Sequence, residues 1–308
     1  MLSKTSSAPS ATAHIVDETV LALHDWQARA DAHRSRADAF TAEHRHRVRR
    51  GETHPVWDFL FTYYRLRPRQ LRVWPPGFGV TLAGHPARDY LRHTGYAETE
   101  HGVAVSSEHV RTRMATVRFV AGLLSATAGR TAVYGCFGMH EWAMVYRSQT
   151  VRHTGVPLRL GPRATDAVVE SMPLRCSHFD AYRFFTPAAV GRNHHRPTRA
   201  TQAEWEQPSC LHANMDLYKW SSKLLPMVDS GLLLDSLELA AHARELDMRA
   251  SPYDLSGYGF EPITVEEPGG RAEYARRQAA IARRAVPVRT ALLNHCRQLL
   301  ATCADRIG

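Results

Sequence analysis

The chain has 308 residues, of which 44% are hydrophobic and 22% are charged, a composition typical of a globular protein with a sizeable core. No apolar run approaches the ~18 residues that a membrane helix requires, so we expect no membrane contact. The formal net charge of +9 comes largely from arginine and favours polyanionic partners such as nucleic acid, although an arginine-rich coding bias produces the same balance.

Residues 1–14 are rich in Ser, Ala and Thr and lack the apolar stretch of a secretory signal. We predict that they form a disordered tail of a cytoplasmic protein and that residues 15–308 form a single helical domain. The five cysteines are an odd number scattered through a long chain, which favours reduced thiols over a disulfide framework. Reduced thiols remain available as metal ligands.

The N-terminal part of the domain begins with a stretch from Ile15 to Arg50 that contains no Pro or Gly, and Gly51 follows it. This pattern predicts one long, mostly polar helix. The aromatic segment HPVWDFLFTYY then places apolar residues at helical spacing from Val56 to Tyr63. The next segment, RVWPPGFGVTLAGHP, has the prolines and glycines of an irregular loop.

Helical signals dominate the rest of the chain. Ser106 precedes an apolar series that Gly129 ends, and strong helix formers run from Asp229 to Met248. A last helix is predicted from Gly270 to Asp305, kinked or split at Pro287. Alternating strand patterns are scarce, and the best are VPLRL and EPITVEE. The predicted fold class is therefore mainly α, with few short strands.

Three segments share a Cys shortly before a His with an acid nearby: YGCFGMHEWAMVYR, LRCSHFDAYRFF and PSCLHANMDLYKW. Their histidines are His140, His178 and His212, and their acids are Glu141, Asp180 and Asp216. Imidazole, carboxylate and thiolate groups are the usual ligands of zinc and iron, so the three histidines are candidate ligands of a divalent transition metal, Zn or Fe. None of the spacings is CxxC, HExxH or ExxH, and a Cys beside a His is often part of a core.

Aromatic and basic residues concentrate in the same segments. Trp142, Tyr182 and Phe185 are candidates to stack on a flat ligand, and Arg147 and Arg183 are candidates to bind phosphate or hold an acid ionised. The catalytic candidates are Asp180 first, then Glu141 and Asp216. The alternative is that aromatics at helical spacing build core, which is their commonest use.

Five segments carry a resemblance to a known family: HPVWDFLFTYYRLRPRQL, YGCFGMHEWAMVYR, LRCSHFDAYRFFTPAA, QPSCLHANMDLYKW and ELDMRASPYDLSGYGFEP. Together, over about residues 53–292, they resemble an actinobacterial family catalogued as 3-methyladenine DNA glycosylases. The resemblance implies hydrolysis of alkylated purines in DNA. The chain lacks the glycine-rich helical hairpin with a downstream Asp that one glycosylase class uses, so no catalytic residue is carried over from it.

Two enzymatic hypotheses result. In the first, the protein is a DNA N-glycosylase in which Asp180 stabilises the sugar cation and Trp142, Tyr182 and Phe185 stack on the flipped base. In the second, it is a metal-dependent enzyme, hydrolytic or oxidative, that acts on a small molecule through His140, His178, His212 and the nearby acids. A third hypothesis, a non-catalytic nucleic-acid-binding protein, explains the charge but not the acids around the histidines. Both enzymatic hypotheses predict that the three histidines share one pocket.

Overall fold

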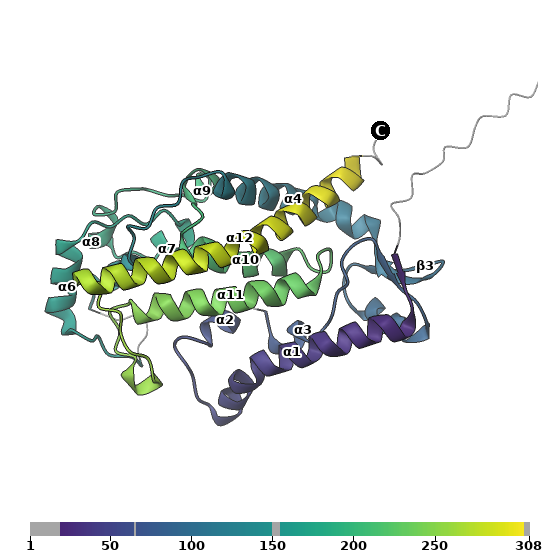
Figure 1. The fold of residues 1–308 in the computed structure, drawn as a ribbon, viewed down its shortest axis with the longest axis horizontal. Coiled ribbons are helices and arrows are strands. Elements are labelled where there is room, and N and C mark those ends of the chain that lie inside the picture. Colours follow the sequence, from purple (N-terminus) through teal and green to yellow (C-terminus); the bar gives the residue numbers. More distant parts are fainter. Residues whose placement is uncertain (1–18, 65, 150–154, 305–308) are drawn as a thin grey trace, which may run out of the picture.

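The computed structural model describes residues 19–64, 66–149 and 155–304, and the chain is mainly α as predicted (Figure 1). The predicted tail, residues 1–14, lies outside the described residues. The longest helices are α1 (Leu23–Arg50), α4 (Ser107–Ala128), α11 (Ser230–Arg249) and α12 (Pro268–Ala304). None of the helices in the described part of the chain is both long enough and apolar enough to cross a membrane.

Four helices form the main core. Figure 1 shows α12 and α11 running side by side, and α10 (Leu211–Lys223) packs against both of them. α4 packs on the other side of α12. The side chain of Ser106 caps α4 by accepting a hydrogen bond from the backbone N–H of His109, and the helix ends at Gly129, as the sequence predicts. Nine of the thirteen residues of α10 are buried, which places this helix at the centre of the fold.

A small four-stranded sheet lies at one end of the molecule, with the strand order β1-β2-β4-β3. Its strands are β1 (Thr19–Leu21), β2 (Val80–Leu82), β3 (Tyr96–Thr99) and β4 (Gly102–Val105). β1 and β2 are parallel, and the other neighbours are antiparallel. A second apolar cluster, which includes Trp26 and Tyr90, covers this sheet.

The remaining elements are short and connect the long helices. They comprise α2 (Phe59–Thr62), α3 (Pro68–Leu71), η1 (His85–Arg92), α5 (Met139–Ala143), α6 (Gly161–Ser171), α7 (Phe179–Tyr182), α8 (Pro187–Val190), α9 (Gln202–Trp205) and η2 (Ser256–Tyr258). Several of these short helices lie beside the candidate site, where they carry its side chains.

Two predictions for the N-terminal part are wrong. The helix predicted from Ile15 begins only at Leu23, because residues 19–21 pair with residues 80–82 as a strand. The segment RVWPPGFGVTLAGHP, predicted to be irregular, supplies that second strand. The main-chain pairing satisfies backbone groups that would otherwise be buried without partners beneath the second apolar cluster.

Two predictions for the C-terminal part also need correction. VPLRL forms one isolated bridge, from Leu158 to Tyr253, and EPITVEE forms no strand, so neither belongs to the sheet. α12 continues through Pro287 without being split. Pro287 and Arg283, the residue whose carbonyl loses its helical partner, are both exposed, so water can satisfy that carbonyl.

Candidate metal centre

Three separate segments bring the predicted histidines together. His140 lies on α5, His178 precedes α7, and His212 is in the first turn of α10. The ring of His212 is 4.4 Å from that of His140 and 5.3 Å from that of His178, measured between centroids. All three histidines line one cavity, which confirms the prediction that they share a pocket.

A first triad consists of His140, His212 and Asp247, whose potential ligand atoms all lie within 4.8 Å of one another. Asp247 comes from the last part of α11 and is fully buried. Its Oδ1 forms an ion pair with Nε2 of His140 at 2.8 Å, yet neither buried atom makes an aligned hydrogen bond with any of the described residues. The two atoms are therefore close without being aligned as donor and acceptor, an arrangement that suits two ligands directed at a common third atom.

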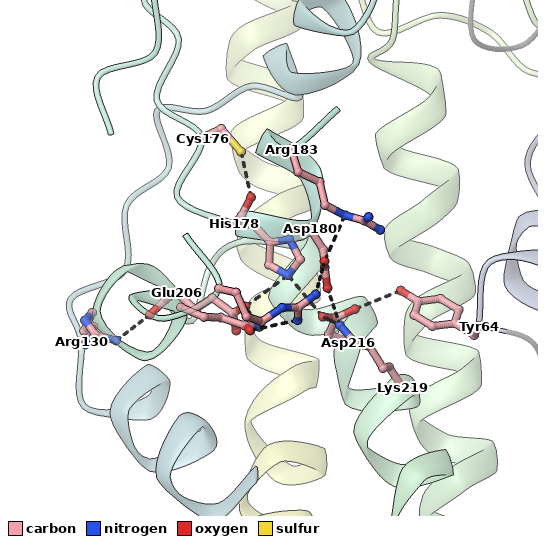
Figure 2. A network of polar contacts seen from close by, with 11 residues as sticks. Tyr64, Arg130, Cys176, His178, Asp180, Arg183, Glu206, Asp216 and Lys219 are labelled. Atoms are coloured by element: carbon pink, nitrogen blue, oxygen red, sulfur yellow. Dashed lines mark hydrogen bonds and ion pairs between the residues drawn. The ribbon is translucent and has the colours of Figure 1, made fainter. Parts of the chain in front are cut away.

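A second triad consists of His178, Glu206 and Asp216, again with all potential ligand atoms within 4.8 Å of one another (Figure 2). The Nε2 atom of His178 is 3.3 Å from a carboxylate oxygen of Glu206 and 3.3 Å from one of Asp216. All three side chains are buried. His212 of the first triad lies next to His178, so the two triads adjoin.

A surrounding layer of hydrogen bonds holds the carboxylates in place. Arg244 donates to Glu141 at 2.9 Å and to Asp247 at 3.0 Å. Lys219 donates to Asp216 at 2.7 Å and to Asp180 at 2.6 Å (Figure 2). Such outer contacts fix the orientation of ligand side chains in metal sites.

The centre perturbs the pKa values of its members. Burial acts to lower the pKa of His140 and of His178, but the neighbouring carboxylates outweigh it and raise both pKa values. Burial lowers the pKa of His212, and the positive charges of His140 and His178 lower it further. These directions favour the neutral imidazole for His212 and the protonated form for His140 and His178, so a metal that binds the latter two would have to displace their protons.

The cavity beside the histidines has a volume of about 530 Å³. Three of the cysteines, Cys136, Cys176 and Cys210, line it together with the histidines, so all three Cys/His segments reach the same space. Burial raises the pKa of the Cys176 and Cys210 thiols, which keeps them protonated. On the side of His212 toward Glu141 and Asp180 lies a separate pocket of only about 20 Å³, the size of one water molecule.

The predicted catalytic acids are all buried but occupy different places. Asp216 is a member of the second triad. Glu141 is bonded to Arg244 and lines the small pocket, not the large cavity. Asp180 also lines the small pocket, where Lys219, Arg199 and Arg183 contact its carboxylate at 2.6, 2.9 and 3.2 Å. The prediction that at least two of these acids are buried or hydrogen-bonded is confirmed.

The predicted substrate-binding residues do not line the large cavity. Trp142 is fully buried, and its indole N–H donates to the carbonyl of Ala250, so its ring serves the core. Phe185 is also buried, against the half-buried Tyr182. Two basic residues, Arg147 and Arg183, are exposed; Arg147 pairs with the exposed Glu170, and Arg183 pairs with the buried Asp180. The placement of Trp142 and Phe185 in the core follows the usual packing of aromatics at helical spacing.

The sequence did not indicate two of the six triad members as ligands. In the sequence, Asp247 is one of several acids near the end of a predicted helix, and no pattern around Glu206 indicates a metal ligand. Glu206 immediately follows α9 in the QAEWEQPSC stretch, four residues before Cys210, and it accepts a hydrogen bond from Gln202 at 2.5 Å. Its proximity in sequence to the third Cys/His segment is the only cue, because its partners His178 and Asp216 come from other elements.

The fold and the site together define a helical protein with a buried histidine and carboxylate centre beside a cavity. No family model, no curated protein and no solved structure matches the chain. The resemblance to the DNA glycosylase family therefore stays a prediction from the sequence.

Proposed function

We propose that the protein is a metal-dependent enzyme that acts on a small molecule in the 530 Å³ cavity, with a pair of divalent transition metal ions held by the two triads. His140, His212 and Asp247 hold one ion, and His178, Glu206 and Asp216 hold the other. The first triad has two imidazoles and one carboxylate, a common ligand set of catalytic zinc and of non-haem iron, and the second has one imidazole and two carboxylates.

The observation that carries the proposal is the pair of orphaned atoms in the first triad. A buried ion pair is favourable only when its remaining polar atoms find partners. Nε2 of His140 and Oδ1 of Asp247 are buried 2.8 Å apart as an ion pair, but among the described residues neither atom has an aligned hydrogen bond, which is a poor arrangement for a purely structural pair. A cation between them satisfies both atoms.

Each part of the chain has a separate task in this proposal. The histidines face the cavity and leave room for a substrate, while the three carboxylates are buried. Arg244 and Lys219 fix the carboxylates and offset their negative charge. A bound zinc ion would activate water for hydrolysis, and iron would support oxidation.

The glycosylase hypothesis receives less support from the site. It requires a carboxylate that reaches the substrate and aromatic rings free to stack on a base. Asp180 is instead neutralised by three cations, and the ring of Trp142 is enclosed in the core. Arg147 and Arg183 are exposed, which is compatible with phosphate contacts, but each side chain already forms an ion pair with an acid.

Elemental analysis of the protein purified without added metal or chelator tests the proposal. We expect close to two transition metal ions per chain. His140→Ala and His178→Ala should each reduce the content by about one ion. His242→Ala is the matched control, because His242 is exposed on α11 and belongs to neither triad. A metal-free wild-type protein that also fails to bind zinc or iron on titration would refute the proposal.

A further inference from the structure

The cavity lining has a buried end, which includes His140 and His178, and an exposed end, which includes Arg175 and His194. His195 and Trp205 belong to the exposed end, because their rings lie 4.6 Å apart and the charges of His194 and Arg175 act on His195. Arg175 is exposed, and none of the described residues forms an ion pair with it. Its guanidinium is therefore available to a ligand at the mouth of the cavity.

One rigid frame connects the two ends. The segments around Cys176 and Asn193 lie side by side, because Asn193 accepts a hydrogen bond from the backbone N–H of Cys176 at 2.8 Å and donates to its carbonyl at 2.9 Å. The backbone N–H of His194 donates to the carbonyl of Leu174 at 2.8 Å. Arg175 at the mouth and His178 at the metal centre are thus held on the same short stretch of chain.

The permanent charges that line the cavity are unbalanced. Arg130 and Arg175 supply two positive charges, and Glu204 supplies the single carboxylate among the lining residues. Arg130 donates to the backbone carbonyls of Glu206 and Ala203, so hydrogen bonds hold it without neutralising it. Burial lowers the pKa of His195, and the charges of His194 and Arg175 lower it further, which reflects the positive potential at this end.

We propose that the substrate of the metal centre is a small anionic molecule whose carboxylate or phosphate group binds Arg175 at the mouth while its opposite end reaches the triad histidines. The inference rests on the proposed metal-dependent function. Two residues separate Arg175 from His178, so their Cα atoms lie at most ~11 Å apart, which limits the length of such a molecule. Its body passes Trp205 and His195, whose rings lie 4.6 Å apart at the same end of the cavity.

Binding of matched probes by calorimetry tests this inference. The probes are 1-naphthoate, 1-naphthyl phosphate and the neutral 1-naphthylmethanol, which share a planar body and differ in charge. Each is titrated into the full chain loaded with zinc and into the chain treated with EDTA, because an anion can also bind zinc directly. Binding to the EDTA-treated chain measures the contribution of Arg175 and its neighbours to the affinity without that of a bound metal ion.

We expect at least one anionic probe to bind about 10-fold more tightly than the neutral probe in both states of the protein. Arg175→Gln should remove this advantage without changing the zinc content. Glu204→Gln is the matched control, because it removes a negative charge from the cavity lining instead of a positive one. It should maintain or increase the ratio of anionic to neutral probe affinity. A preference for the phosphate probe identifies phosphate esters as the substrate class, and equal or better binding of naphthoate identifies carboxylates.

Equal affinity for neutral and anionic probes, or an unchanged preference in Arg175→Gln, would overturn the inference. The outcome is separable from that of the metal proposal. A chain that holds two metal ions but shows no anion preference contradicts only the substrate class. A chain that prefers anions through Arg175 but binds no metal contradicts the proposed function and leaves an anion site at the cavity mouth.

Discussion

Metal binding at the two triads should raise the thermal stability of the protein by an amount that can be worked out. A ligand at 100 times its dissociation constant stabilises the folded state by about 2.7 kcal/mol per site. At roughly 2.1 cal/mol/K per residue, a chain of 308 residues unfolds with an entropy of about 0.65 kcal/mol/K. One occupied site therefore raises Tm by about 4 °C, and two independent sites raise it by about 8 °C.

The assay is thermal unfolding of the EDTA-treated protein with and without added zinc or iron. Asp247→Asn and Glu206→Gln each remove a ligand charge from one triad while keeping the size of the side chain, so each should retain about half of the shift. Asp235→Asn changes an exposed acid on α11 and should retain the whole shift. A shift of equal size in the wild type and in the Asp247→Asn, Glu206→Gln double variant would refute the two-triad reasoning.

Three further predictions concern residues outside the triads. Burial acts to raise the pKa of Asp58, but hydrogen bonds from Arg47 and other neighbours outweigh it and lower that pKa. Asp58→Asn should therefore cost about 1–3 kcal/mol at pH 7, and urea unfolding should show this difference vanish as the pH falls below ~4. Asp180→Asn should lower stability, because Lys219 loses a charged partner, but it should leave the metal content unchanged. Loss of metal in this variant would contradict the assignment of Asp180 to a position outside the metal ligands. Gly102 has a positive φ, and an added Cβ would lie 2.0 Å from the carbonyl oxygen of Leu82 in β2. Gly102→Ala should therefore lower Tm, and an unchanged Tm would contradict this reasoning.

The helical part of the fold could be predicted because its signals are local. Ser106 and Gly129 mark the ends of α4, and the run of helix formers marks α11. The sheet could not be predicted, since strands of three or four residues contain too little alternation to recognise. Its first strand pairs with a partner about sixty residues away, a contact that no window around Thr19 reveals.

The three histidines and Asp216 could be predicted from their own segments, whereas Asp247 and Glu206 could not, because they lie outside those segments. The repeated Cys/His/acid composition is visible within each segment, and it identified all three imidazoles that line the cavity. The acid next to a histidine in sequence proved to be its partner in neither the first nor the second segment. His140 lies beside Asp247 of α11 and not beside Glu141, because consecutive side chains on a helix point in directions about 100° apart.

The position of the centre on α10 is itself an argument for function. This helix is central to the core, yet its inward residues include Asn214 and Asp216, and His212 and Lys219 follow the same side at helical spacing. Burying such groups costs free energy that apolar residues of similar size would not, so a helix selected for stability alone favours Leu or Met at these positions. The hydrogen bonds of Lys219 offset part of that cost for Asp216. In the first triad, Arg244 donates to the second oxygen of Asp247, but Nε2 of His140 and Oδ1 of Asp247, 2.8 Å apart, have no aligned hydrogen bond among the described residues. We propose that a cation bound by both atoms completes their coordination.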